Sequence, residues 1–185
     1  MKKRNAFTII EVVLVLAIAG LIFLMVFIAL PALQRSQRNT RRRQDVSRIA
    51  SALTSYYSSN NKMPFYKEGR YQYFDYGFIK NYVESNIVMP DVNPAKMTGD
   101  LTVSCMEGKD CNEFSDPNGS VYGVAIVDTT EGLSNDSSNM NKIIFTPSSK
   151  CGSEKTIKLG DGDEKSMFAV SVMLEGGSLY CVDNS

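Results

Sequence analysis

Residues 7–33 read FTIIEVVLVLAIAGLIFLMVFIALPAL, and Glu11 is the only charged residue among them. From Val12 to Leu33 the chain carries no charge, and as a helix this run rises about 33 Å, enough to cross the hydrocarbon core of a bilayer. A secretory signal peptide has a shorter apolar core followed by a small-residue cleavage site. The run therefore predicts a transmembrane helix over 12–33, and its simplest interpretation is a single-pass signal anchor.

Glu11 sets this run apart from an ordinary anchor, because it stands at the N-terminal edge of the apolar residues. An ionised carboxylate within a membrane helix costs about 2–4 kcal/mol near the bilayer centre and less near its edge. A plain anchor gains nothing from such a group. We therefore expect Glu11 to be a functional residue with a positively charged partner.

The residues around Glu11 resemble the leader and cleavage motif of type IV pilins. Lys2-Lys3-Arg4-Asn5-Ala6 form the leader, residues 1–6, and Phe7-Thr8-Ile9-Ile10-Glu11 lead into the apolar run. The resemblance implies that a prepilin peptidase cuts between Ala6 and Phe7 and that Phe7 is then N-methylated. It also implies that Thr8 and Glu11 act in filament assembly, where the acid pairs with the N-terminus of a neighbouring subunit. The family usually has Gly before the cut, where this chain has Ala6.

Electrostatics supports the same role for Glu11. Removing the leader creates a cationic amine on Phe7, four residues before the carboxylate, and the positive end of the helix dipole also favours an acid there. Between subunits, a buried pair of this kind is better suited to fixing the axial stagger than to adding stability.

Gly20 and Pro31 mark weak points in the predicted helix. Pro31 cannot donate a hydrogen bond to the carbonyl of Phe27, so we expect a kink or an opened turn there. An ordinary transmembrane kink is the alternative interpretation.

Beyond Pro31 an amphipathic stripe predicts that the helix continues, so that it covers residues 7–58 in all. The stripe consists of Val46, Ile49, Ala50, Leu53 and Tyr57. We expect the helix to end near Ser58, before a polar stretch and Pro64, and its apolar face to pack on a sheet.

Five arginines between Arg35 and Arg43 follow the apolar run. By the positive-inside rule they outweigh Lys2, Lys3 and Arg4 and predict a cytoplasmic head. The cysteines, the Ser- and Asn-rich head and the pilin resemblance predict the opposite, and we follow them. The arginines then have three alternative roles: binding outer-leaflet phosphates, binding DNA, or forming a solvated helix face.

The remaining residues, 59–185, predict a globular head. We expect an aromatic-rich irregular connection over 59–100, with a short helix at about 74–84, and then an antiparallel sheet and disulfide region over 101–185. The expected strands are 101–105, 121–127, 142–146, 156–159, 168–174 and 178–182, and Glu175-Gly176-Gly177-Ser178 forms a hairpin turn. The fold class is thus α+β, a long helix packed on an antiparallel sheet, which is also the pilin plan.

The cysteine and histidine content limits which disulfides, catalytic sites and metal sites the chain can form. The four cysteines, Cys105, Cys111, Cys151 and Cys181, are even in number and predict two disulfides outside the cytoplasm. Three connectivities are open, and we favour Cys105–Cys111 with Cys151–Cys181. The chain has no His, which removes the His-based triads and most catalytic zinc sites. We expect no enzyme activity, no cofactor and no metal, and interpret residues 160–164 (GDGDE) as a solvated turn rather than a calcium loop.

The prediction is a structural subunit of a type IV pilus, held in the cytoplasmic membrane with its head outside before assembly and extracellular afterwards. The resemblance implies an assembly platform and an ATPase as partners, a homopolymeric filament, and roles in attachment, twitching motility or DNA uptake. One alternative is a pseudopilin of a type II secretion or competence system. Another is a single-pass adhesin or receptor that never polymerises, and a membrane-tethered hydrolase is disfavoured by the missing His. A host surface or DNA remains an open partner.

Overall fold

The computed structural model describes residues 8–68, 71–88, 103–127, 137–153, 156–158 and 167–184. The chain divides into two compact units, Met1–Gln37 and Arg38–Ser185. The expected leader, the cleavage residues Ala6 and Phe7, and the turn at 160–164 lie outside the described residues.

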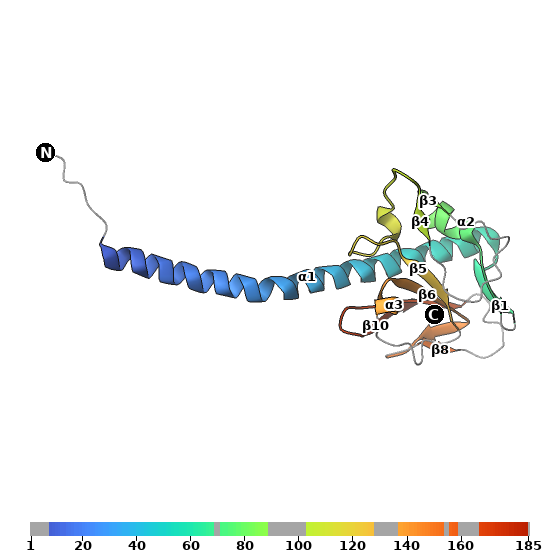
Figure 1. Cartoon of the computed structure of the whole chain (residues 1–185). Coiled ribbons are helices and arrows are strands. Elements are labelled where there is room, and N and C mark those ends of the chain that lie inside the picture. The colour runs from blue at the N-terminus through green and yellow to red at the C-terminus, as the bar shows by residue number, and fades with distance from the viewer. Residues whose placement is uncertain are drawn as a thin grey trace. The chain divides into compact units, whose positions relative to one another are not determined.

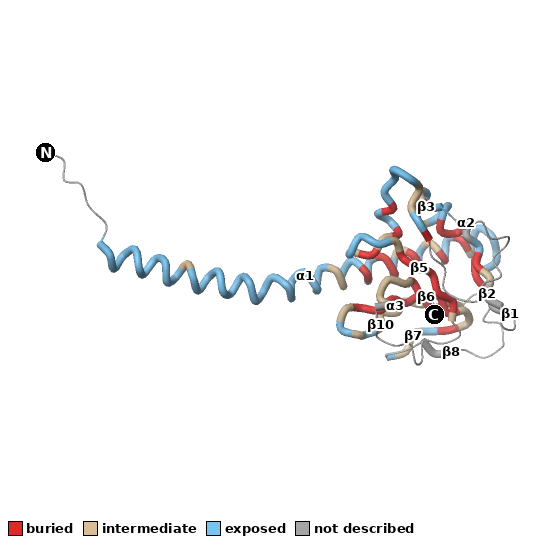
Figure 2. Tube along the Cα trace, viewed as in Figure 1, coloured by how far each residue is buried: buried red, intermediate tan, exposed pale blue. Residues whose placement is uncertain are grey.

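Helix α1 runs from Ile9 to Asn60 (Figure 1). Within the first unit its large apolar side chains are exposed along the whole run, from Ile9 at 85% to Leu33 at 56% (Figure 2). It is a helix long and apolar enough to cross a membrane. Pro31 lies inside α1 and the helix is continuous on both sides of it, so the expected opening of this turn is not found. A kink at Gly20 or Pro31 stays a prediction.

In the second unit α1 presents one buried face, as the amphipathic stripe predicts. Val46, Ile49 and Leu53 are fully buried, and the last buried ring is Tyr56 rather than the expected Tyr57. The helix ends two residues later than expected, because Asn61 takes a left-handed conformation (φ 52°) and donates its N–H to the carbonyl of Tyr57 at 2.8 Å.

A four-stranded sheet in the order β10-β9-β6-β5 packs on this face. Its strands are β5 (Gly123–Ile126), β6 (Lys142–Pro147), β9 (Phe168–Met173) and β10 (Leu179–Asp183). β6–β9 and β9–β10 are antiparallel, whereas β5 and β6 are parallel, so the sheet is mixed and the expectation of a purely antiparallel sheet is wrong for this edge. The α+β layout of a long helix on a mainly antiparallel sheet, like that of a type IV pilin, is confirmed.

Successive side chains of a strand point to opposite faces of the sheet, and this decides which of them pack against α1. The side chains that join the α1 face are those of Val124, Ile126, Ile143, Phe145, Phe168, Val170, Val172 and Leu174. The residues between them in β9, Ala169, Ser171 and Met173, are buried as well, so both faces of this strand are covered. Helix α3 (Ser137–Met140) contacts β9.

Shorter elements surround the sheet. They are β1 (Phe65–Glu68), β2 (Tyr71–Phe74), α2 (Tyr76–Phe78), the π-helix Ile79–Val83, β3 (Ile87–Val88), β4 (Ser104–Cys105), the 3-10 turn Asn112–Phe114, β7 (Ser149–Cys151) and β8 (Thr156–Lys158). Two corrections follow for 59–100: this segment holds a β1–β2 hairpin, and the expected helix at 74–84 begins only at Tyr76, because Phe74 lies in β2 opposite Phe65.

Candidate functional site

Thr8 and Glu11 form a reciprocal hydrogen-bonded pair at the first turn of α1. The backbone N–H and the hydroxyl of Thr8 each donate to Glu11 Oε2 at 2.9 Å. In return the N–H of Glu11 points to Thr8 Oγ1 at 3.4 Å. Thr8 is the residue before the helix and Glu11 is its third, so the two make a capping box that satisfies backbone donors at the helix start.

This geometry gives Glu11 a local hydrogen-bond partner, Thr8, in addition to the cationic partner expected from the sequence. The pattern Thr-x-x-Glu before an apolar run is itself the capping-box signature, so this hydrogen-bonded pair could have been predicted from the sequence. The cap holds the carboxylate beside the N-terminus of its own helix, at the backbone N–H of Thr8. A cleaved chain would therefore carry an oriented acid next to its new amine, where either its own amine or that of a neighbour is a suitable partner.

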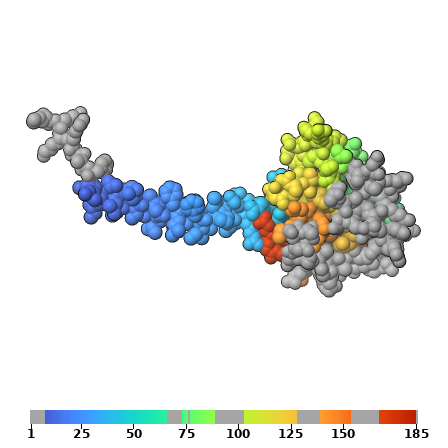
Figure 3. Space-filling view, in the orientation of Figure 1, coloured from blue at the N-terminus to red at the C-terminus, as the bar shows by residue number. Residues whose placement is uncertain are grey.

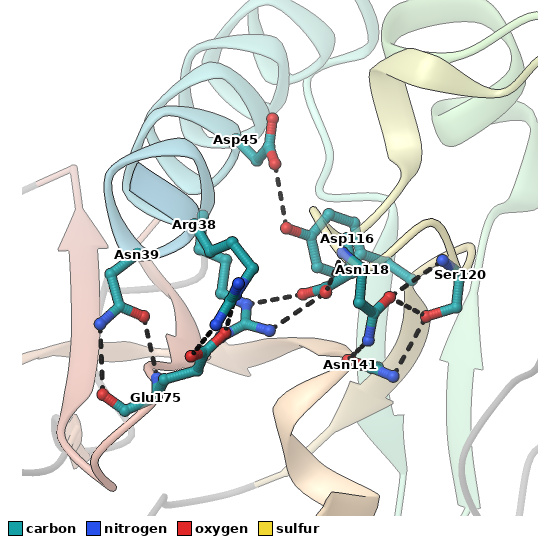
Figure 4. A network of polar contacts seen from close by, with 10 residues as sticks. Arg38, Asn39, Asp45, Asp116, Asn118, Ser120, Asn141 and Glu175 are labelled. Carbon is teal, nitrogen blue, oxygen red and sulfur yellow. Dashed lines mark hydrogen bonds and ion pairs between the residues drawn. The ribbon is translucent and has the colours of Figure 1, made fainter. Parts of the chain in front are cut away.

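A second polar cluster lies in the other unit, where arginines of α1 meet carboxylates of the head (Figure 4). Arg42 Nε lies 2.6 Å from Asp116 Oδ2, and Arg42 NH2 donates to Asp116 Oδ1 at 3.1 Å. Both side chains are buried, with 2% and 0% exposed. Burial lowers the pKa of the Arg42 guanidinium, but the hydrogen bonds and charges of Asp116 and Glu175 outweigh it and leave the pKa raised.

Glu175, in the turn between β9 and β10, fastens the hairpin to α1. Its carboxylate binds Arg38 through Nε at 2.5 Å and NH2 at 2.8 Å, and lies 3.5 Å from Arg42 NH1. Its backbone pairs with the amide of Asn39, which donates to Glu175 O at 3.2 Å and accepts from Glu175 N at 2.9 Å. Figure 3 shows the C-terminal hairpin in red against the helix. The turn contains the expected Gly176-Gly177 pair, and both glycines have positive φ.

Asp45 and Arg48 continue the cluster one turn further along α1. Tyr122 donates its hydroxyl to Asp45 Oδ2 at 2.9 Å. Arg48 lies 3.6 Å from Asp45 Oδ1 and 2.6 Å from Glu113 Oε2. Burial raises the pKa of Asp45, and this outweighs the lowering by the Tyr122 hydrogen bond and the nearby arginines. Burial and the adjacent Asp45 raise the pKa of Tyr122 in turn.

The turn that carries Asp116 is itself held by hydrogen bonds. Gly119 (φ 93°) donates its N–H to the carbonyl of Asp116 at 2.8 Å, and Asn118 donates its N–H to Asp116 Oδ1 at 3.0 Å. The Asn118 amide binds Asn141, and Asn141 Nδ2 donates to Ser120 Oγ, both at 3.1 Å. Residues 116–119 thus form a turn that positions a carboxylate for α1.

The cysteines form two disulfides, Cys105–Cys111 and Cys151–Cys181. This is the pairing favoured by the sequence. The second joins β7 to β10, where the N–H of Cys151 also donates to Asp183. Among the described residues no group of three or more His, Cys, Asp or Glu side chains is placed to hold a metal ion.

The N-terminal residues match a known family model. Residues 1–27 match the family model described as the prokaryotic N-terminal methylation motif. The chain carries a type IV prepilin signature. The match covers the capping box and most of the exposed apolar helix but none of the head. Searches of curated proteins and of solved structures give no match to this chain.

The prepilin signature has direct consequences. It supports a type IV pilin-like or pseudopilin substrate of prepilin peptidase, and it implies processing by that peptidase and polymerisation. It points to a structural rather than an enzymatic family. The prepilin helix is consistent with membrane anchoring and with a pilus.

Proposed function

We propose that the chain is a structural subunit of a type IV pilus. The observation that carries the proposal is the prepilin signature on a helix whose apolar side chains are exposed along its first unit. So large an apolar surface needs a cover. A bilayer supplies it before assembly, and the same helices of other copies supply it in a filament.

The capping box adds a chemical step to this proposal. Cleavage between Ala6 and Phe7 releases an amine, which is then methylated, next to a carboxylate already oriented by Thr8. In the filament Glu11 takes the amine of a neighbouring subunit as its partner, and the pair fixes the stagger between helices. An assembly platform and an ATPase extract the subunit from the membrane, and the filament serves in attachment, twitching motility or DNA uptake.

N-terminal mass analysis of protein sheared from the cell surface tests the proposal. We expect a mature chain that begins with N-methyl-Phe7, recovered from filaments visible by electron microscopy. An intact Met1 on cell-surface protein, with no filaments, would instead identify a single-pass adhesin or receptor. A processed Phe7 in a filament that stays within the envelope would identify a pseudopilin, which the signature also fits.

A further inference from the structure

We propose that Arg41 and Arg43 bind phosphates of anionic lipid headgroups in the outer leaflet while the subunit is anchored in the membrane, before it is assembled into a filament. This inference rests on the membrane-anchored stage of the proposed function. It separates two sets of arginines on α1: Arg38, Arg42 and Arg48 hold the head, and Arg41 and Arg43 contact lipid.

The first set is neutralised within the chain. Arg38 pairs with Glu175, Arg42 with Asp116, and Arg48 with Glu113. Arg38 and Arg42 each bind their carboxylate in two-point geometry, which leaves few donors for another anion, and Arg48 contacts both the carboxylate and the backbone carbonyl of Glu113. These three arginines therefore serve the contact between α1 and the head.

The second set has no such partner. Arg41 and Arg43 are exposed, and neither forms an ion pair with the described part of the chain. Arg41 NH2 donates to the carbonyl of Asn112 at 3.4 Å, and Arg43 lies over the ring of Tyr180 at 5.7 Å. Asp45, one turn beyond Arg41, accepts from Tyr122 and faces Arg48. Both guanidinium groups keep donors available for an anion.

Their position along the helix matches the headgroup layer. Arg41 and Arg43 follow Leu33 by eight and ten residues, which is about 12–15 Å along a helix. Helical side chains lean toward the helix N-terminus, here toward the apolar run, and a long Arg side chain keeps its charge at the end of a flexible stem. The headgroup region adds about 5–8 Å beyond the hydrocarbon core. The two charges therefore reach the level of the lipid phosphates.

Their position around the helix favours lipid over a nucleic acid. At 3.6 residues per turn, positions 41 and 43 lie about 160° apart, on opposite flanks of the stripe formed by Arg38 and Arg42. A leaflet surrounds a transmembrane helix and offers phosphates on both flanks. A DNA duplex docks against one side and would meet one of the two arginines.

The test compares lipid preference in two variants of the full chain with the same loss of charge. The wild-type chain and the variants are placed in nanodiscs of mixed phosphatidylcholine and phosphatidylglycerol, and the lipids retained are counted by native mass spectrometry. We expect the phosphatidylglycerol preference to fall about fivefold for each arginine lost in Arg41→Gln/Arg43→Gln. The matched control, Arg38→Gln/Arg48→Gln, removes two charges that are already paired and retains most of the preference.

Three outcomes would overturn the inference: an unchanged preference in Arg41→Gln/Arg43→Gln, an equal loss in the control, or equally tight capture of inorganic phosphate by the detergent-solubilised chain. Binding of a DNA duplex that depends on Arg41 and Arg43, without lipid preference, would assign the site to nucleic acid. A wild-type chain that alkaline carbonate extracts from membranes would refute the membrane stage of the proposed function as well. Normal processing at Phe7 without lipid preference would refute this inference alone.

Discussion

At the scale of single residues, the Arg42–Asp116 pair makes the sharpest stability prediction. Asp116→Asn leaves a buried guanidinium with only the more distant Glu175, so we expect a loss of about 3–5 kcal/mol in the free energy of unfolding. Arg42→Met/Asp116→Leu removes both charges and should be more stable than the single variant. The exposed Arg41→Gln, as a control, should change stability by less than about 0.5 kcal/mol.

Urea unfolding of the detergent-solubilised chain, followed by near-ultraviolet circular dichroism, measures these differences, since the chain has nine Tyr and no Trp. If Asp116→Asn unfolds at the same urea concentration as Arg41→Gln, the pair does not hold α1 to the head.

The raised pKa of Asp45 predicts that the free energy of unfolding changes with pH in the opposite direction to that expected for a salt-bridged acid. Its pKa is raised by burial, so the folded chain holds this proton at pH values where the unfolded chain has released it. Raising the pH from about 4 through the raised pKa therefore lowers the free energy of unfolding. Asp45→Asn keeps an acceptor for Tyr122 but has no proton to lose. Its stability relative to wild type should rise between pH 3 and pH 7 in the same urea assay, and a constant difference would contradict the assignment.

At the scale of elements, the two disulfides close loops of different length and should differ in effect. Cys151–Cys181 spans 30 residues and Cys105–Cys111 spans 6. In the chain-entropy model the first contributes about 4 kcal/mol and the second about 2 kcal/mol. We expect Cys151→Ala/Cys181→Ala to lower the thermal midpoint more than Cys105→Ala/Cys111→Ala, measured by circular dichroism. The reverse order would show that local packing around the buried Cys111 dominates.

Elements with a strong period or turn signal were predictable from sequence, and those set by distant partners were not. The alternation in β9 and the Gly176-Gly177 turn identified the C-terminal hairpin. β7 was missed because Ser149–Cys151 is short and polar, and β2 because its last residue, Phe74, fits a helical spacing with Phe78 and Tyr82. Periodicity says nothing of strand direction, so the parallel β5–β6 pair was not foreseen.

The same limit applies to the candidate sites. Thr8 and Glu11 lie three residues apart within the segment that resembles the prepilin motif, so the resemblance named both, although not the hydrogen bonds between them. The partner of Arg42 lies 74 residues away in Asp116, and no local pattern links them. The arginine run could therefore be assigned to lipid, DNA or solvent, but not to the head that neutralises part of it.

At the scale of the whole molecule, we expect the carboxylate of Glu11 to be needed for filament assembly but not for membrane insertion. The apolar run of the first unit is unchanged in Glu11→Val or Glu11→Ala, so either variant should enter the membrane and resist carbonate extraction as wild type does. Each lacks the acid that Thr8 orients, so its copies should be depleted from sheared filaments when co-expressed with tagged wild type. Thr8→Ser keeps the hydroxyl of the capping box and serves as the matched control, which should assemble normally. Filaments that contain Glu11→Val at its share of the membrane pool would mean that the exposed apolar face alone directs assembly, and that Glu11 serves only to cap its own helix.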